Sequence, residues 1–154
     1  MPIVVDGWVE VLGGGQDPRD AERCWDALLS LRPFSVGAYE MSGYLFGLTK
    51  EPSVTGRFLE RGVPRDACAA IRRDVAANAR FMGTRADGDG EYGHTFATWS
   101  EVRAAIASPD APAAETDLSY GWPAVFVTVT FLASQLRLPD DGGEHLRIAV
   151  WASS

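Results

Sequence analysis

Two short stretches with the alternating pattern of β-strands stand near the two ends of this chain, and they most constrain what it can fold into. Residues 3–12 alternate, are rich in Val and Ile, and stop at Gly13 to Gly15. Residues 146–153 alternate in the same way after the turn Asp140 to Gly143. Strand side chains point alternately to the two faces of a sheet, so both segments are predicted to be strands, paired with each other.

The segment after the glycines is predicted to be a helix. Asp17 followed by Pro18 suits an N-cap and first turn, and apolar side chains from Ala21 to Leu29 keep the spacing of one helical face. Pro33 would end this helix near Leu31. The sequence therefore predicts a helix directly after the first strand.

Three further helices and a brief strand are predicted in the middle of the chain. The predicted helices cover residues 35–48 with Ser35 as the cap, residues 66–82, and residues 101–107 with Ser100 as the cap, and the predicted strand covers residues 94–99. Residues 84–93 hold three glycines and three acidic residues. They are predicted to form a mobile acidic loop, which acts as a lid or is simply solvated.

Residues 123–137 suit either a helix or a buried strand. Val125, Val129 and Leu132 have the spacing of one helical face, whereas Val127 and Phe131 continue a strand-like alternation. We favour the helix because the run is long.

Together these elements predict an α+β fold. A small sheet that includes the N- and C-terminal strands would pack with four or five helices, in an order that does not alternate as a doubly wound sheet requires. The chain has 154 residues, of which 46% are hydrophobic and 23% charged. This size and composition are typical of a single globular domain, spanning residues 1–154.

The sequence favours a cytoplasmic location without a membrane partner. Residues 1–5 run straight into Asp6 without the pattern of a secretory leader, and the apolar stretch 123–133 is shorter than the ~20 residues that span a bilayer. Cys24 and Cys68 lie on predicted apolar helix faces, so we expect both to be buried, reduced thiols.

Motifs for cofactors and metals are missing from the sequence. It has no Gly-rich phosphate loop ending in Lys-Ser or Lys-Thr, no dinucleotide fingerprint and no Gly-x-Ser-x-Gly element. A structural zinc site would need both histidines, His94 and His145, and both cysteines. We therefore predict neither a cofactor nor a bound metal.

The segment of residues 57–85 concentrates positive charge in an acidic chain. It carries seven of the thirteen arginines against three acidic residues, while the rest of the chain has a formal charge of −11. Arginine pairs with phosphate or carboxylate through two parallel hydrogen bonds, so this segment would hold a small anion. The candidate ligand-binding residues are Arg57, Arg61 and Arg65, with Tyr44 and Trp99 as aromatic neighbours for a base.

A solvated helix face is the alternative interpretation of these arginines, with Glu60, Asp66 and Asp74 as their local partners. At a net charge of −7 the chain would repel extended nucleic acid. A mononucleotide or a cyclic dinucleotide needs only a few basic groups, so a nucleotide-derived ligand stays compatible with the charge.

Asp6, Glu10 and His94 are weak candidates for catalysis. Asp6 and Glu10 lie on the same face of the first strand, and they would form a carboxylate and imidazole cluster if the His94 segment lay beside it. The alternative is that this face is the wetter side of an edge strand.

A resemblance to other proteins is carried by five short segments: Val9 to Val11, Tyr39 to Leu48, Arg61 to Pro64, His94 to Val102, and Leu146 to Trp151. In these segments the chain resembles a group of uncharacterised small bacteriophage and prophage proteins that often begin Met-Gly-Cys-Asp-Ile-His. It implies a phage setting and a cytoplasmic protein, and it brings no established activity. The Cys-Asp-x-His positions of the group fall on Ile3, Val4 and Asp6, so no role passes to them.

Three functions follow as hypotheses. The first is a protein that binds a small anionic, nucleotide-derived ligand without turnover, as a phage counter-defence sponge would. The second is an acidic interaction or inhibitor protein that binds a host protein, and the third is a metal-assisted hydrolase. The sequence leaves self-association open.

Overall fold

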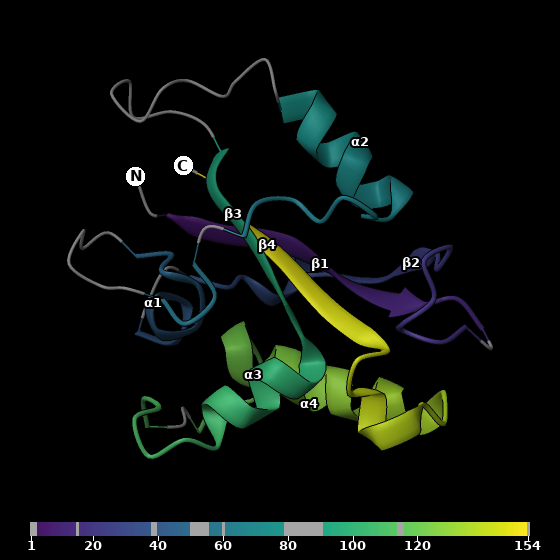
Figure 1. Ribbon diagram of the computed structural model, residues 1–154. Helices are drawn as coiled ribbons and strands as arrows, with labels where there is room; N and C mark the ends of the chain where they lie inside the picture. The colour runs from purple at the N-terminus through teal and green to yellow at the C-terminus, as the bar shows by residue number, and fades with distance from the viewer. Residues whose placement is uncertain are drawn as a thin grey trace.

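A four-stranded antiparallel sheet lies at the centre of the protein (Figure 1). The computed structural model describes residues 3–14, 16–37, 40–49, 56–59, 61–78, 91–113 and 116–153. Within these residues the strands are β1 (Val4–Leu12), β2 (Trp25–Ser30), β3 (Glu91–Thr98) and β4 (Leu146–Ser153), in the spatial order β2-β1-β4-β3. The helices are α1 (Glu40–Phe46), α2 (Ala69–Asn78), α3 (Trp99–Ile106) and α4 (Gly121–Gln135). The predicted α+β class is confirmed.

The two terminal strands lie side by side, as the sequence predicts. β1 pairs with β4 from the Val4–Ser153 pair to the Val11–Leu146 pair. A Cβ atom at Gly7 would lie 2.1 Å from the carbonyl oxygen of Ala149. Glycine is therefore required at this position of the β1–β4 pair.

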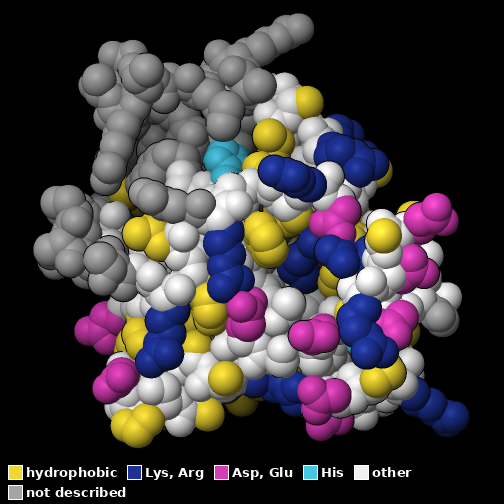
Figure 2. Space-filling view, in the orientation of Figure 1, with side chains coloured by type: hydrophobic (Ala, Val, Ile, Leu, Met, Phe, Trp, Pro, Cys, Tyr) yellow, Lys and Arg dark blue, Asp and Glu magenta, His cyan; other side chains and the backbone are white. Residues whose placement is uncertain are grey.

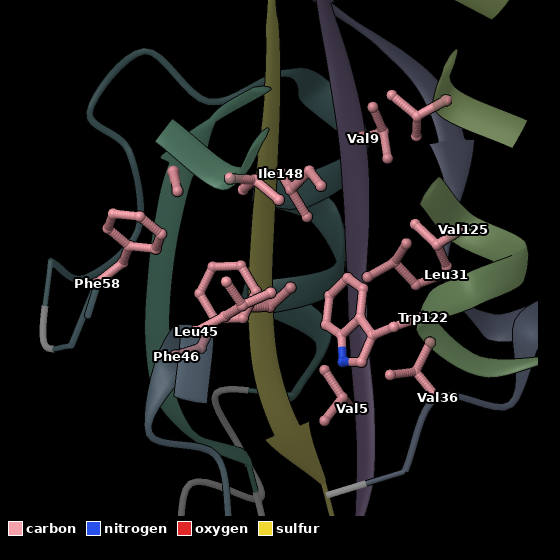
Figure 3. Close-up of a cluster of buried hydrophobic side chains, with 14 of the residues drawn as sticks. Val5, Val9, Leu31, Val36, Leu45, Phe46, Phe58, Trp122, Val125 and Ile148 are labelled. Carbon is pink, nitrogen blue, oxygen red and sulfur yellow. The ribbon is translucent and has the colours of Figure 1, made fainter. Parts of the chain in front are cut away.

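Helices cover both faces of the sheet. α2 packs on one face, and α1, α3 and α4 lie on the other (Figure 1). On the second face, Val5 and Ile148 of the sheet meet Phe46 of α1 and Trp122 of α4 (Figure 3). The β-branched residues of the terminal strands thus fill the main core.

Residues 121–135 form a helix, which confirms the favoured prediction for this stretch. The cap of α3 differs from the prediction. Thr98, and not Ser100, is the N-cap: its hydroxyl accepts from the backbone N–H of Glu101, and the Glu101 carboxylate accepts from the N–H of Thr98. This reciprocal pair is a capping box.

The predicted helix over residues 17–31 is wrong. Asp17 instead accepts hydrogen bonds from the N–H and guanidinium of Arg19 in a local turn, and residues 25–30 form β2 beside β1. A bulge in this pairing falls between Val9 and Glu10. The apolar spacing suits a helix, but as a strand this segment also supplies hydrogen-bond partners for the edge of β1 that β4 leaves unpaired.

Several predicted elements are shorter than expected or differ in detail. Ser35 ends a short 3-10 helix (Arg32–Phe34) and does not cap α1. α2 begins at Ala69, and residues 79–82 of the predicted helix lie outside the described residues. So do Tyr39 and residues 84–90 of the predicted acidic loop, while residues 91–93 belong to β3. Cys68 is buried as predicted, whereas Cys24 is exposed because it lies in the turn before β2 and not on a helix.

Candidate functional site

The guanidinium of Arg61 is already engaged inside the protein. It donates two hydrogen bonds to the carboxylate of Glu101, at 2.8 and 2.9 Å, and lies 4.9 Å from the centre of the Phe58 ring. Burial alone would raise the pKa of Glu101, but the hydrogen bonds of Arg61 and Thr98 hold this pKa below its usual range. Arg61 therefore fastens the chain before α2 to the first turn of α3.

Arg57 is engaged at the opposite end of α3. Its Nη2 donates to Ser108 Oγ at 3.1 Å and lies 3.6 Å from Asp110, and its guanidinium lies 5.1 Å from the centre of the Tyr44 ring. The Tyr44 hydroxyl donates to the carbonyl oxygen of Ala105 at 2.7 Å. Arg57 and Arg61 are therefore held toward opposite ends of α3, whose eight residues span roughly 12 Å.

Trp99 belongs to the hydrophobic core, since only 2% of its surface is exposed. It cannot stack on a ligand without unpacking α3. Of the predicted ligand-binding set, the structure brings Arg57 and Tyr44 together, holds Arg61 at the first turn of α3, and buries Trp99.

The outer surface of α2 is more basic than its sequence suggests. Arg65, Arg72 and Arg73 are all exposed. The acidic residues expected to neutralise them are used elsewhere: Asp74 accepts from Trp8 Nε1 at 2.8 Å, and Asp66 accepts from Arg147 Nη1 at 2.7 Å. Figure 2 shows dark blue side chains over α2, with acidic side chains gathered lower on the same face. Glu60 lies outside the described residues.

A network of charged side chains lies between α2 and the sheet. Glu10 is fully buried; its Oε1 accepts from the N–H of Cys68, and its Oε2 accepts from Arg147 Nε, both at 2.6 Å. Asp66 accepts from Arg147, from Arg23 Nε at 2.8 Å and from Trp25 Nε1 at 3.0 Å. Every polar group named here has a partner, so we interpret the network as a structural link that holds α2 to the sheet.

Asp6, Glu10 and His94 do not come together. Asp6 faces Trp151 across the β1–β4 pair, and His94 on β3 stacks on the far side against the same Trp151, with ring centroids 5.6 Å apart. Glu10 lies opposite Arg147, further along the strand. Within the described part of the chain, no three His, Cys, Asp or Glu side chains are grouped so that they could hold a metal.

The alternative prediction, that this face of the first strand is the wetter side of an edge strand, is also wrong. β1 is an inner strand of the sheet, and Glu10 is buried. Burial lowers the pKa of His94, which favours its neutral form. Neither finding supports acid–base catalysis by this trio.

An apolar groove of about 710 Å³ opens beside the first two turns of α4. Its walls come from α1, the end of α3, the chain before α4, and α4 itself. The groove is lined by Ser35, Gly37, Glu40, Met41, Ile106, Pro112, Ala113, Leu118, Tyr120, Gly121, Trp122, Pro123, Phe126 and Val127. Its volume and largely apolar lining are those of a binding groove for an apolar group.

Exposed apolar side chains are concentrated on α4 and in the chain directly before it. Seven large hydrophobic side chains are exposed in the described residues, and five of them lie between residues 118 and 136. These five are Leu118, Tyr120, Val127, Phe131 and Leu136. We call this set, together with the groove, the α4 surface.

Sequence reasoning missed the α4 surface, although a signal for it was present. α4 has no charged residue in its fifteen positions, and its apolar residues extend beyond the face that packs on the core. An uncharged helix whose apolar side chains extend past its core-facing stripe leaves some of them in solvent unless another surface covers them. Of the helices in the described residues, none is long and apolar enough to cross a membrane.

A second, polar hollow of about 640 Å³ lies at the other end of the molecule, beside Asp17, Asp140 and His145. Two of its acidic side chains, Asp17 and Asp140, pair with arginines. The Arg19 hydrogen bonds lower the pKa of Asp17 to about 2, and Arg103 Nη2 lies 3.4 Å from Asp140.

Comparisons with known proteins find no match, whether with protein-family models, with curated proteins or with solved structures.

Proposed function

We propose that this chain acts by binding a partner protein at the α4 surface, and not by catalysis. The observation that carries the proposal is the concentration of exposed apolar side chains on this surface. Phe131 is 60% exposed, Leu118 58% and Val127 50%. Exposed apolar side chains scattered singly are ordinary, whereas a contiguous patch beside a groove is typical of an interaction site.

The groove also sets the chemistry of its occupant. Glu40 is the charged residue among the described side chains that line it. The occupant should therefore present an apolar side chain to the groove and a basic group to its rim. Glu40 lies at the first turn of α1, which is fixed against α4 by a hydrogen bond of 2.7 Å from Trp122 Nε1 to Ser42 Oγ.

Photo-crosslinking inside cells tests this function. Benzoylphenylalanine would replace Val127, which lines the groove, and in a control chain Leu59, which is 41% exposed away from it. We expect a crosslinked product from position 127 and none from position 59. Equal crosslinking at both positions, or none at 127, would contradict the proposal.

A second function is favoured by the charge of α2. Because Asp66 and Asp74 turn toward the sheet, Arg65, Arg72 and Arg73 are exposed and have no carboxylate partner among the residues that the structure describes. Such a cluster suits a small polyanion, so the nucleotide-sponge hypothesis moves from Arg57 and Arg61 to this surface. A phage protein of this kind would sequester a host signal without turnover.

Calorimetry with a cyclic dinucleotide tests the second function. Replacing both Arg72 and Arg73 by Gln should remove the binding, whereas replacing Arg19, which is exposed outside α2, should leave it unchanged. No heat from the unmodified chain would argue against the sponge. Binding that survives the α2 substitutions would place the ligand elsewhere.

A further inference from the structure

We infer that the partner at the α4 surface is a second copy of this chain, packed so that the two α4 helices run antiparallel about a two-fold axis. The inference rests on the proposed interaction function and names its partner. Trp122 and Val125 point from α4 into the core (Figure 3), so the opposite side of the helix is the one that a second copy would cover.

The α4 surface has a groove and a protruding side chain at different positions along one helix. The groove lies beside the N-terminal half, where Phe126 and Val127 form part of its wall. Phe131, which is 60% exposed, lies one turn further on, and it shares the outward side of the helix with Val127. An antiparallel pair with its axis near the middle of α4 places Phe131 of each copy at the groove of the other, as a two-fold interface requires.

The charges fit the same arrangement. α4 itself has no charged residue, so contact between two copies of this helix brings no like charges together within it, although each chain carries a formal charge of −7. Glu40 stands beside the N-terminal end of α4, and the exposed Arg137 follows its C-terminal end. Antiparallel packing brings Arg137 of each copy to Glu40 of the other, and so forms two ion pairs.

The ion pairs can form only between copies. Within one chain, Glu40 lies beside the first turn of α4 and Arg137 follows its last turn. The fifteen residues of α4 keep the two apart by roughly 22 Å at the rise of an α-helix. A parallel pair would bring like ends together and leave both residues unpaired. A small apolar molecule would fill the groove but leave Phe131 in water.

Sedimentation of the purified chain at increasing concentration is the first part of the test. We expect a dimer with a dissociation constant on the order of 10 µM, because only a few exposed apolar side chains would be buried in each copy. Phe131→Asp should yield a monomer, while the matched control Leu59→Asp should leave the dimer intact. A monomer at every concentration, or a dimer that survives Phe131→Asp, overturns the inference.

A charge exchange is the second part of the test. Glu40→Arg and Arg137→Glu should each weaken the dimer by about tenfold, because attraction becomes repulsion at two rim contacts. An equimolar mixture of the two variants should restore full affinity, since both contacts in the mixed dimer then join opposite charges. Absence of this rescue overturns the antiparallel arrangement, because a merely structural effect of either substitution would persist in the mixture.

The crosslinking at Val127 separates failure of this inference from failure of the proposed function. A product with twice the mass of the chain supports the second copy. A product that contains a different protein, together with a monomeric purified chain, overturns the second copy and leaves the interaction function standing. A monomeric chain with no product overturns both.

Discussion

The carboxylate of Glu10 and the guanidinium of Arg147 form an ion pair at 2.6 Å although their side chains are 0% and 4% exposed. The pair joins neighbouring residues of the two terminal strands. The Arg147 guanidinium also lies 4.1 Å from the centre of the Trp25 ring, and it reaches Asp66 before α2. An ionised pair is tolerated in such a place only when its remaining polar atoms are also satisfied.

Removing one member of this pair should be strongly destabilising. Arg147→Met leaves the Glu10 charge buried with only the Cys68 N–H as a partner, so we expect the free energy of unfolding to fall by about 3–5 kcal/mol. Urea unfolding followed by tryptophan fluorescence measures the change. The matched control is Arg19→Met, because Arg19 pairs with Asp17 at an exposed site and should contribute little.

The double variant Glu10→Gln with Arg147→Met is expected to be less destabilised than the sum of the two single variants, because no charge is then left alone. Additive losses would show that the two side chains stabilise the fold independently, which contradicts the ion pair as a unit.

Acid should destabilise the protein through Asp66. Burial alone would raise the pKa of Asp66, but the hydrogen bond and charge of Arg147, with Arg23 and Trp25, bring this pKa below its usual value. The unfolded chain therefore takes up protons first as the pH falls below about 4, and the stabilisation by Asp66 is lost as the pH passes through the folded pKa. It is fully present at neutral pH.

Comparison with Asp66→Asn isolates this contribution. The variant should be less stable at neutral pH and should lose less of its remaining stability between about pH 4 and pH 2. The pKa of Glu101 is also lowered, so Glu101 contributes part of the pH dependence of the free energy of unfolding in both proteins. Parallel stability curves for the two proteins would exclude Asp66 as a source of the acid sensitivity.

The parts of the fold that the sequence predicts correctly are those whose pattern fits one kind of element. The alternation near both termini indicates strands, and the length of the run in α4 decides for a helix. The helix predicted over β2 is wrong because Trp25, Leu28 and Leu29 have helical spacing. The pairing with β1 that makes this segment a strand depends on residues elsewhere in the chain.

The candidate site is less predictable for the same reason. Arg61 pairs with Glu101, forty positions away, and Asp66 pairs with Arg147, eighty-one positions away. Neither distance leaves a local sequence signal, so local charge counting assigns the wrong partners to Arg61 and Asp66. The α4 surface depends on which faces of a helix are left uncovered, and this is known only once the elements are packed.

The cap of α3 provides a test that separates two neighbouring hydroxyl groups. Thr98→Ala should lower the free energy of unfolding by about 1 kcal/mol, because it leaves the Glu101 N–H without its capping oxygen. Ser100→Ala is the control and should change little, because its side chain contacts the Thr98 hydroxyl and caps no helix. Urea unfolding of both variants decides the matter, and a larger loss for Ser100→Ala would reverse the assignment.

The two cysteines should differ sharply in their rate of reaction with a thiol reagent, and the rate at the slower one should depend on the Glu10–Arg147 ion pair. Cys24 is exposed and should react at once with Ellman's reagent. Burial, reinforced by the charge of Glu10, raises the pKa of the Cys68 thiol, so little reactive thiolate is present. The Cys24→Ser chain should therefore react slowly, at a rate set by opening of the α2 face.

Adding Arg147→Met to this chain should accelerate the reaction, because Glu10 then holds the Cys68 backbone without support from β4. An unchanged rate would mean that α2 opens independently of the buried ion pair.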